Sequence, residues 1–483
     1  MRIAEIMPTP KEMDLSEEQA VLVDHDWHVR DESGLIDVGT KFAEAFCIGV
    51  NDEPHRVILR RGEGAGREEY ELRIEPGEIC ITAGHRPGFM HALATIDHLR
   101  DGPMLPVGRI GDRPRLPVRG LQLMVEKIHQ LDEAQIHSLM RSAARHKLNT
   151  LLIEFGDRFP FEGEHESVAS PSALTRPQLR GIVETARDLG LEIIPLVQCM
   201  GHLEWLLKHE QYAGVREEEE ARAQLCPSNE RSLEVWGELT EQVIDFLGGC
   251  ERLHVGGDET RQLGVCPRCA ARVDEGGKGR LYADHVNRVC AWLAERGIAP
   301  IVWDDILCAH PETMDHLHGA AEVMYWDYWT TQDPSPLLVA RGSGSVVYDE
   351  RWDSEWEGEL PGTTRRTLDR FARPVRLDAD LTEEYLGVYR GYLGEDFPKY
   401  VRAFPYLEYY QERGRVVYGA PTCSGNHSYW HTLPDIPRHG ENIKTFADRC
   451  IEAGAKGMIT SGWYNRSPEL LHFGIVATAE FTW

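Results

Sequence analysis

The sequence predicts a (β/α)8 (TIM) barrel preceded by a small α+β domain. From residue 117 onward, eight short apolar segments alternate with amphipathic helical segments. Segments that are apolar throughout suit parallel strands covered by helices, and eight strand–helix units suit a closed barrel. The preceding residues follow a different pattern, and a chain of 483 residues has room for two domains. We therefore assign residues 1–111 to the α+β domain and residues 112–483 to the barrel.

The α+β domain is predicted from alternating apolar and polar residues. The stretch YELRIEPGEICITAG reads as two strands joined at Pro76–Gly77, and MHALATIDHLR (90–100) follows as a helix. The stretch IGDRPRLPVRG (110–120) contains the junction with the barrel.

The barrel strands are predicted from their apolar character, and the helices between them from their end signals. Thr175 begins one helix and Gly190 ends it, while Ser228 caps the next helix, which ends at Gly248–Gly249. The predicted strands are 121–126, 150–155, 192–197, 252–257, 299–304, 321–326, 415–420 and 456–463.

Two segments of the barrel depart from this alternation. Residues 327–414 form an unusually long connection between the sixth and seventh strands, which is typical of a functional or inserted subdomain. The charge run REEEEAR (216–222) is predicted to be the solvated face of a helix.

The charge and cysteine content narrow the classes of function. The chain has 52 Lys and Arg against 79 Asp and Glu, a net charge of −27, which should repel nucleic acid and anionic membranes. The start MRIAEIMPTPKEMDLS contains no secretory signal, and no run of ~18 apolar residues is present. The eleven cysteines lie mostly in apolar or helical patterns, so we expect reduced thiols in a cytoplasmic protein.

Cys266 and Cys269 form a lone C-x-x-C in VCPRC. A structural zinc site usually needs four ligands, and no second Cys or His pair is close in sequence. We expect unmetalled thiols on a loop, although distant Cys or His residues could complete a structural site.

Polar and aromatic residues follow most of the predicted strands, where a barrel of this kind carries its chemistry. Trp faces stack on sugar rings, while carboxylates supply acid–base catalysis and accept hydrogen bonds from hydroxyls. The set predicts chemistry on a glycoside. The alternative is that the polar residues only line the mouth of the barrel and that the tryptophans belong to its core. The residues are Glu154, Asp157, Gln198, His202, Asp258, Glu259, Trp303, Asp304, Asp305, Trp326, Asp327, Tyr328, Trp463 and Asn465.

Asp258 and Glu259 are adjacent acids just past the fourth strand. Gly256 and Gly257 permit a bend in the backbone that lets both side chains reach one site. Two carboxylates in different environments can divide the work, because one of them can hold a proton near neutral pH.

The stretch HVGGDE (254–259) resembles the H-x-G-G-D-E signature of glycoside hydrolase family 20, the β-N-acetylhexosaminidases. PRLPVRGLQL, KLNTLLIEFGD, IPLVQCMGH and IVWDD resemble the family's first, second, third and fifth strands, and the hexosaminidase D branch is the most similar. The resemblance implies a retaining exo-β-N-acetylhexosaminidase that uses no metal or cofactor. Its substrate would be a glycan or glycoconjugate with a terminal β-linked GalNAc and/or GlcNAc.

In that family the substrate's own 2-acetamido carbonyl attacks C1 and gives an oxazolinium intermediate. The resemblance implies that Asp258 orients the acetamido group and that Glu259 is the general acid and base. Asp157 and His202 match the relay to the general acid. The implied substrate contacts are Arg119 on the O3/O4 hydroxyls, Trp303, Trp326 and Trp463 as aromatic walls, and Asp304, Tyr328, Tyr418 and Asn465.

The departures from the family pattern fall on the sugar-recognition side. GDRFPFEG lacks the second Asp and the Trp of the family's D-D-Q-G-W-R, and Met124 replaces an aspartate. Asn465 stands where the family has a glutamate that holds O4/O6. Either Tyr328 or Tyr418 could bind the acetamido carbonyl. Specificity therefore stays open, and the branch resemblance favours N-acetylgalactosamine.

Two other classes of function also stay open. One is a non-catalytic glycan-binding barrel, which the intact Asp258, Glu259 and His202 argue against. The other is a metal-dependent hydrolase that uses His254, Asp258 and His202. The sequence leaves the oligomeric state open, including a homo-oligomer.

Overall fold

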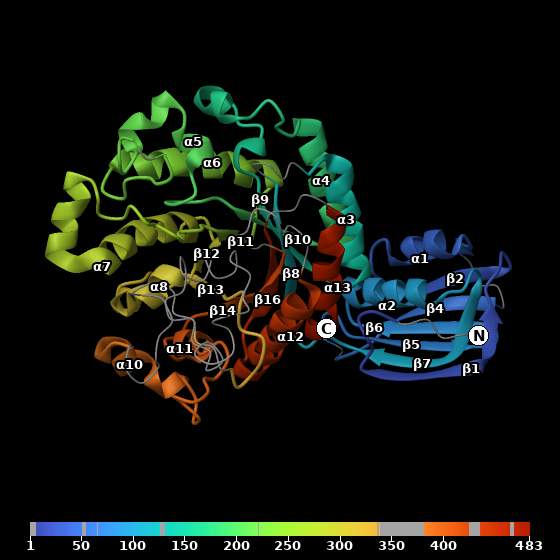
Figure 1. The fold of residues 1–483 in the computed structure, drawn as a ribbon. Coiled ribbons are helices and arrows are strands. Elements are labelled where there is room, and N and C mark those ends of the chain that lie inside the picture. Colours follow the sequence, from blue (N-terminus) through green and yellow to red (C-terminus); the bar gives the residue numbers. More distant parts are fainter. Residues whose placement is uncertain are drawn as a thin grey trace. The chain divides into compact units, whose positions relative to one another are not determined.

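The computed structural model describes residues 6–50, 55–64, 66–125, 131–220, 222–335, 338, 381–424, 435–463 and 468–483. The chain divides into two compact units, drawn in Figure 1. The first unit contains Met1–Arg119, Arg141–Asn149 and Ala479–Trp483. The second contains Gly120–Met140 and Thr150–Thr478. The domain boundary that we placed at residues 111–112 falls inside the first unit.

The first unit is a mixed sheet with two helices. Figure 1 shows α1 (Val38–Phe46) and α2 (Arg86–Leu99) along one face of the sheet. The predicted hairpin is present: β5 and β6 pair antiparallel from Tyr70↔Ala83 to Glu75↔Glu78, around the turn at Pro76–Gly77. The sheet order is β1-β7-β5-β6-β4-β2-β3. The strands are β1 (Glu12–Leu22), β2 (Trp27–Glu32), β3 (Gly49–Val50), β4 (His55–Arg61), β5 (Tyr70–Glu75), β6 (Glu78–Ala83) and β7 (Met104–Asp112).

The second unit is the predicted (β/α)8 barrel. Eight parallel strands follow the order of the chain, and pairing of β14 with β16 and of β16 with β8 closes the barrel. The short β15 (Thr422–Ser424) adds to β16 outside this ring. Each strand overlaps one of the predicted apolar segments. They are β8 (Val118–Met124), β9 (Thr150–Glu154), β10 (Glu192–Leu196), β11 (Arg252–His254), β12 (Ala299–Trp303), β13 (Glu322–Trp326), β14 (Val417–Ala420) and β16 (Gly457–Gly462).

The barrel helices begin and end largely at the predicted signals. Thr175 caps α4 in a reciprocal pair with Gln178, and Gly190 ends the helix in the left-handed conformation. The cap predicted at Ser228 is wrong by one residue, since Asn229 accepts the Arg231 N–H at 3.2 Å. The larger helices are α3 (Glu133–Arg145), α4 (Arg176–Leu189), α6 (Glu230–Leu247), α7 (Pro267–Ala294), α12 (Ile436–Ala453) and α13 (Leu471–Thr482).

Smaller elements lie in the connections after the strands. The predicted insertion at 327–414 contains α10 (Glu383–Tyr389), η6 (Arg390–Tyr392) and α11 (Tyr406–Glu412), while 336–337 and 339–380 lie outside the described residues. The other short elements are η1 (Gly156–Arg158), η2 (Gly163–Val168), α5 (Glu204–Leu207), η3 (Glu210–Val215), α8 (Asp305–Ala309), η4 (Pro311–Asp315) and η7 (Pro468–Leu470).

The charge run at 216–222 is not the predicted helix. Arg216 pairs with Leu225 in an antiparallel bridge, and the Glu217 N–H donates to the Gln224 carbonyl at 3.0 Å. Both Arg216 and Glu217 are buried. The run fails as a helix because the chain pairs with itself on either side of it, and we call residues 215–220 and 222–226 the hairpin segment.

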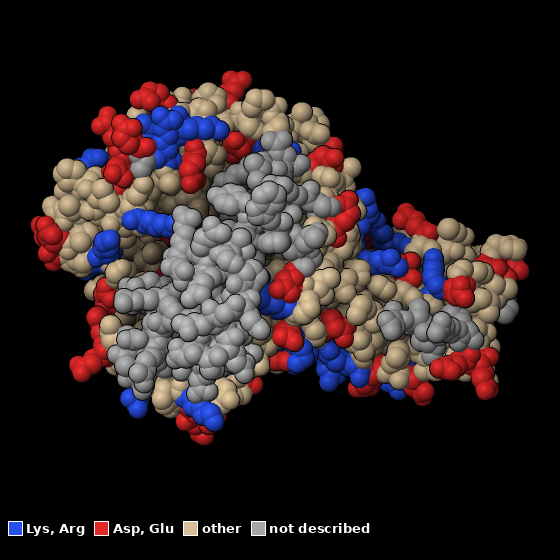
Figure 2. Space-filling model, viewed as in Figure 1, with Lys and Arg blue, Asp and Glu red and all other residues tan. Residues whose placement is uncertain are grey.

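The surface carries charged side chains of both signs. On the face shown in Figure 2, Asp and Glu side chains are spread among Lys and Arg over the described residues. None of the helices in the described ranges is both long enough and apolar enough to cross a membrane.

Candidate active site

The two acidic residues follow a turn that only glycine can form. After β11, Gly256 and Gly257 have φ values of +66° and +88°, in the left-handed region. A Cβ on Gly256 would lie 1.7 Å from Gln198 Oε1, and a Cβ on Gly257 would lie 2.7 Å from Tyr282 Oη. The bend that we expected between the strand and Asp258 is therefore enforced by the surrounding side chains.

Hydrogen bonds from two strands hold this turn. The Gly256 N–H donates to His254 Nδ1 at 3.0 Å, and the Gly256 carbonyl accepts the Trp303 N–H at 3.1 Å. The Glu259 N–H donates to Asp305 Oδ2 at 2.9 Å. Burial lowers the pKa of His254 to about 3, so its neutral ring can accept the Gly256 hydrogen. His254 is thus a positioning residue for the turn.

His202 lies between the two carboxylates. Its Nε2 is 3.2 Å from Asp258 Oδ2 and 3.7 Å from Glu259 Oε2. Burial lowers the pKa of His202, but Asp258, Glu259 and Glu154 outweigh burial and raise it to about 10. Burial also raises the pKa of Asp258, but His202 holds it below the usual value. At neutral pH the site therefore contains an imidazolium–carboxylate pair.

The two carboxylates occupy different environments. Asp258 is buried, with a residue exposure of 8%, and its Oδ1 has no hydrogen-bond partner among the described residues. The Glu259 side chain is 32% exposed, and its Oε2 lies 3.1 Å from Arg261 Nη2. One acid thus presents an unpaired oxygen inside the site, while the other faces solvent. This is the division of environments expected from the sequence.

Aromatic side chains at the carboxyl ends of β12, β13 and β16 gather into one group that includes a contact with His254. The half-buried Trp463 donates its indole N–H to Tyr328 Oη at 2.8 Å, and the Tyr328 ring lies 5.0 Å from Trp326. Trp303 is 1% exposed and lies 6.4 Å from Trp463 and 4.3 Å from His254, measured between ring centroids. The structure therefore brings these four predicted aromatic residues together, with Trp303 in the core of the group.

Two predicted acids have other partners. Asp157 does not form the expected relay with His202, because its Oδ2 lies 3.4 Å from Lys208 Nζ. Asp304 is fully buried; its carboxylate accepts the Trp326 N–H at 3.2 Å and the Tyr410 hydroxyl at 3.4 Å. Asp304 therefore fixes the end of β13, and the structure does not present it to a sugar.

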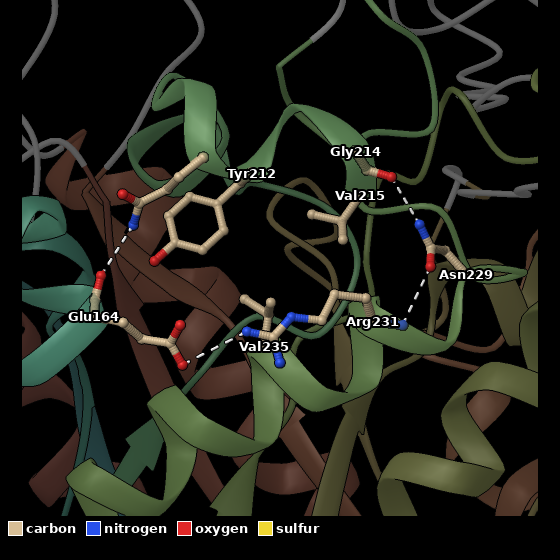
Figure 3. A pocket seen from close by; sticks show the side chains of 8 residues that line it. Glu164, Tyr212, Gly214, Val215, Asn229, Arg231 and Val235 are labelled. Carbon is tan, nitrogen blue, oxygen red and sulfur yellow. Dashed lines mark hydrogen bonds and ion pairs between the residues drawn. The ribbon is translucent and has the colours of Figure 1, made fainter.

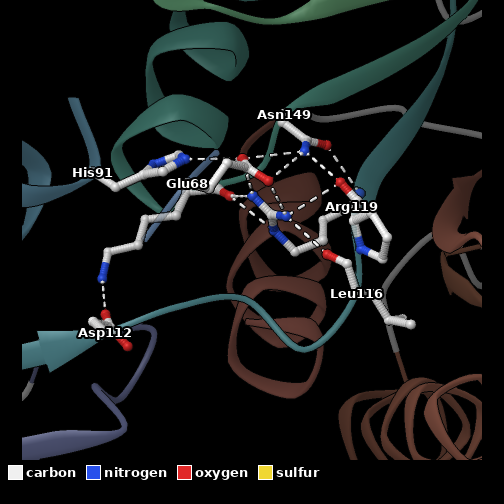
Figure 4. A network of polar contacts seen from close by, with 8 residues as sticks. Glu68, His91, Asp112, Leu116, Arg119 and Asn149 are labelled. Atoms are coloured by element: carbon white, nitrogen blue, oxygen red, sulfur yellow. Dashed lines mark hydrogen bonds and ion pairs between the residues drawn. The ribbon is translucent and has the colours of Figure 1, made fainter. Parts of the chain in front are cut away.

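Arg119 is not a substrate residue in this structure. It is the second residue of β8, five residues or ~16 Å of extended chain before the strand's carboxyl end. Its guanidinium is fully buried and bound to Glu68 at 2.7 and 3.0 Å, and to the Lys147 and Leu116 carbonyls (Figure 4).

Other groups complete the buried network around Arg119. His91 Nε2 lies 3.0 Å from the Glu68 carboxylate, and the Trp483 ring lies 4.9 Å from the guanidinium carbon of Arg119. Although burial raises the pKa of Glu68, Arg119 and His91 hold it far below the usual range. The network stabilises the first unit, and it leaves no guanidinium edge for sugar hydroxyls.

Tyr418 is also misplaced by the sequence reasoning. It is the second residue of β14, and its hydroxyl donates to Glu322 at 2.6 Å and lies 3.1 Å from Arg252 Nη1. Glu322 and Arg252 begin β13 and β11, so this cluster lies at the amino ends of the strands. Of the two candidate tyrosines, Tyr328 is the one that contacts the predicted aromatic residues Trp326 and Trp463. Asn465 lies outside the described residues.

Three residues that the sequence placed at the strand ends without individual roles, Glu154, Gln198 and Asp305, organise the site. Asp305 fixes the Glu259 backbone, as described above. Gln198 Nε2 donates to Glu154 Oε1 at 3.4 Å, and Gln198 Oε1 accepts the Gly257 N–H at 3.4 Å. Their positions after β9, β10 and β12 were a usable signal, because those strand ends meet at the barrel mouth.

A separate cavity of about 290 Å³ lies outside this group of residues. It contains none of the predicted site residues, and Figure 3 shows the Glu164 carboxylate facing Arg231, 3.6 Å away. It is lined by Glu164, Gln211, Tyr212, Gly214, Val215, Asn229, Arg231 and Val235.

Two groups of described residues have ligand atoms close enough to hold a metal ion, all within 4.8 Å of one another. One is Glu164, His165 and Glu238, and the other is Glu217, Cys226, Cys266 and Cys269. Neither group contains His202, His254 or Asp258. In the first group Glu238 already pairs with Arg231 at 2.7 Å.

Comparison with known proteins supports the predicted family. The model of "glycosyl hydrolase family 20, catalytic domain" matches residues 120–351, which contain Asp258, Glu259 and His202. Residues 120–351 are therefore similar in sequence to the catalytic domain of this family. This match confirms the family resemblance that was predicted from HVGGDE.

Curated proteins that are similar to this chain are named as hexosaminidases. Human hexosaminidase D is 34% identical over 192 residues, which cover 38% of this chain and 40% of the relative. The Akkermansia muciniphila β-hexosaminidase is 26% identical over 279 residues, or 49% of this chain and 55% of the relative. The chain thus spans about half the length of these curated relatives or less.

Solved structures agree with the fold. The β-N-acetylhexosaminidase of Bacteroides fragilis superposes with a TM-score of 0.68 at 15% identity, covering 100% of this chain and 91% of that one. The Flavobacterium johnsoniae chitobiase also gives 0.68, at 17% identity, with 99% and 69% covered. The chain therefore has the same fold as these structures.

Proposed function

We propose that the chain is a retaining exo-β-N-acetylhexosaminidase that removes terminal β-linked GalNAc and/or GlcNAc by substrate-assisted catalysis. The observation that carries this proposal is the buried Oδ1 of Asp258, which lacks a hydrogen-bond partner in the part of the chain that the structure describes. An unpaired buried acceptor is costly, and an amide N–H of the substrate would satisfy it. The family resemblance supports the class of substrate.

Asp258 would act on the acetamido group. Its second oxygen is held by His202 at 3.2 Å, so the carboxylate stays ionised at neutral pH and its open oxygen keeps a fixed direction. A negative charge at that point stabilises the positive charge that develops as the amide oxygen attacks C1. Asp258 then contributes to the transition state more than to binding of the substrate.

Glu259 would act on the glycosidic oxygen and then on water. Its exposed side chain suits both steps, because the leaving group and the incoming water reach it from solvent. In the protonated state, Glu259 would donate its proton as the glycosidic bond breaks, and it would recover a proton from water in the second step. With Glu259 neutral, Asp258 and His202 form a balanced pair of charges.

Two substitutions test these roles on 4-nitrophenyl and unactivated N-acetylhexosaminides. Glu259→Gln should lose ~10²–10⁴-fold in kcat/KM on the unactivated substrate, because the leaving group then needs an acid. Asp258→Asn should lower kcat more than it raises KM, and it should weaken inhibition by a thiazoline analogue of the cyclised intermediate. Exposed Glu251, just before β11, supplies the matched control Glu251→Gln, which should keep wild-type rates.

The 2-acetamido group is the second test. Matched β-glucosides and β-galactosides lack the internal nucleophile and should be nearly inert. Comparable rates on both substrate classes would contradict substrate assistance. Unchanged activity of Glu259→Gln on the unactivated substrate would contradict the role of Glu259. If the wild-type protein bound the sugars but turned none of them over, the result would favour the non-catalytic glycan-binding barrel.

The choice between the two sugars stays a prediction. Resemblance to the hexosaminidase D branch favours N-acetylgalactosamine, and rates on the two chromogenic N-acetylhexosaminides measured side by side decide it. The cytoplasmic location also stays a prediction. The eleven cysteines are all free in the structure, which supports a reducing compartment without deciding it.

A further inference from the structure

Three cysteine thiols and one carboxylate converge at the start of α7. Cys226 Sγ lies 3.6 Å from both Cys266 Sγ and Cys269 Sγ. The Glu217 Oε2 atom is 3.1 Å from Cys269 Sγ. All four ligand atoms lie within 4.8 Å of one another. Cys226, Cys269 and Glu217 are buried and Cys266 is half-buried.

The spacing of the sulfurs fits tetrahedral coordination. Thiolates bound to zinc at about 2.3 Å in a tetrahedron lie ~3.8 Å apart. The two sulfur pairs at 3.6 Å approach this separation, whereas a disulfide requires about 2.05 Å. Three thiolates and a carboxylate also make a complete set of four ligands, which is typical of closed structural sites. Sulfur ligands favour Zn²⁺ over Mg²⁺ or Ca²⁺.

The surroundings fit an anionic metal centre. The Cys269 N–H lies 3.4 Å from Cys266 Sγ, and the Cys266 N–H donates to Glu217 Oε1 at 3.1 Å. Both N–H groups are at the amino end of α7, which favours negative charge. Arg268 Nη2 lies 3.9 Å from Cys226 Sγ, so a cation also offsets the charge of three thiolates and a carboxylate.

Ser228 completes the contacts of this group. Its hydroxyl oxygen is 3.0 Å from Cys269 Sγ and 3.4 Å from Arg272 Nη1. These partners orient the sulfurs before any ion binds, which is the function of the outer contacts in metal sites.

The cluster joins the two loops that carry the candidate catalytic residues. Glu217 and Cys226 belong to the hairpin segment, which bonds the loop after β10: the Leu225 N–H donates to Met200 O at 2.9 Å, next to Gly201 and His202. Cys266 and Cys269 follow the loop that carries Asp258 and Glu259. A metal ion here would cross-link the His202 loop to the loop of the acids.

We propose that Glu217, Cys226, Cys266 and Cys269 form a structural site for a thiophilic divalent cation, Zn²⁺. The site replaces our expectation of unmetalled thiols on a loop. It is separate from the proposed chemistry, which uses no metal ion, and its test does not depend on glycosidase activity.

Metal analysis of the full-length protein, purified without chelator and without added metal, is the first measurement. We expect about one zinc per chain, and Cys269→Ser or Cys226→Ser should lower it to less than ~0.2. The half-buried Cys250, which belongs to neither of the metal-capable groups, gives the matched control Cys250→Ser with an unchanged zinc content.

Cobalt reconstitution keeps the test independent of how the variants fold. Wild-type protein stripped with chelator under reducing conditions should take up Co²⁺ and develop the intense visible and near-ultraviolet bands of tetrahedral cobalt with thiolate ligands, and zinc should displace it. Unfolding of the stripped protein should occur at a lower temperature than that of the zinc-loaded protein.

Two results would overturn the proposal. One is a zinc content below ~0.2 per chain together with no thiolate-to-cobalt band after reconstitution. The other is a titration of the denatured, unreduced protein that finds two of the eleven thiols missing, which would identify a disulfide in the cluster instead. Glycosidase activity that failed with zinc present would contradict the proposed function and leave the metal site standing.

Discussion

Replacing His202 by Asn should make the stability of the protein respond differently to pH. In the folded chain the pKa of His202 is raised to about 10, against an ordinary value of 6.5. A group whose pKa is raised by folding contributes stability that is complete below pH ~6.5 and is lost as the pH rises through ~10. Asn cannot take up this proton. The difference in unfolding free energy between wild type and variant, followed against pH, therefore reports the contribution of the His202 imidazolium.

The structure sets the size of the effect. A displacement of ~3.5 pKa units corresponds to ~5 kcal/mol, at ~1.4 kcal/mol for each unit. Because the His202 side chain is 30% exposed, solvent screening should reduce this to ~2–4 kcal/mol. Two nearby carboxylates, at 3.2 and 3.7 Å, supply the interaction. At strongly acidic pH the advantage should shrink again, because Asp258 takes up a proton once the pH falls through its lowered pKa.

The assay is urea unfolding followed by tryptophan fluorescence, from pH 5 to pH 10. The stability difference between wild type and His202→Asn should be largest near pH 5–6.5 and should approach zero near pH 10. Exposed His25, which lies 3.3 Å from Asp26, gives the control His25→Asn, whose difference should stay near zero at every pH. A difference for His202→Asn that is constant with pH would refute the assignment of an imidazolium between the acids.

Three further substitutions test other parts of the structure. Gly256→Ala should lower kcat ~10²-fold or more, because an alanine in the left-handed conformation is strained and its Cβ collides with Gln198, which displaces Asp258. Wild-type kinetics in this variant would contradict this account of the turn. Arg119→Met should cost ~3–5 kcal/mol of stability by leaving Glu68 buried without its partner, while KM of the folded fraction stays unchanged. A raised KM with normal stability would return Arg119 to the substrate site. Tyr328→Phe removes the acceptor of the Trp463 indole N–H and should raise KM ~2–10-fold, with melting temperature as the control measurement.

The fold was predictable because its signals are local. Each barrel strand is a short apolar run, and each helix carries its own caps, so periodicity and end signals locate them without knowledge of their neighbours. The HVGGDE turn is equally local: the last residue of the strand before it, its two glycines and the two acids all lie within six consecutive residues. The sequence therefore located the acidic pair, and the end of the neighbouring strand located His202.

The wrong assignments of Arg119, Tyr418 and the charge run depend on partners that are distant in sequence. Arg119 is bound by Glu68, which is 51 residues away, and Tyr418 is bound by Glu322, which is 96 residues away. Neither partner can be inferred from a local pattern. The charge run at 216–222 failed for the same reason, because Glu217 is buried against Cys266 and Cys269 rather than solvated. A residue early in a strand was a usable warning, because barrel chemistry lies at the other end.

Two residues of the site have strained backbone conformations that neighbouring residues must stabilise. His202 and Glu259 both have positive φ values, +53° and +47°, which cost ~1–3 kcal/mol each and persist only where the surroundings impose them. Part of the support is steric, since a Cβ on Gly201 would lie 2.6 Å from the Asp258 carbonyl.

The rest of the support comes from the segments that the cysteine cluster joins, where the Gln262 N–H also donates to Gln224 Oε1 at 3.0 Å. Removing the proposed zinc should therefore reach the catalytic residues through the backbone. If His202 moves away from the acids when zinc is removed, its raised pKa must fall toward its ordinary value, because the raising depends on distances of 3.2 and 3.7 Å. The pH-dependent stability difference between wild type and His202→Asn should then be smaller in stripped protein than in zinc-loaded protein. An equal difference in both forms would mean that hydrogen bonds alone hold the two loops together.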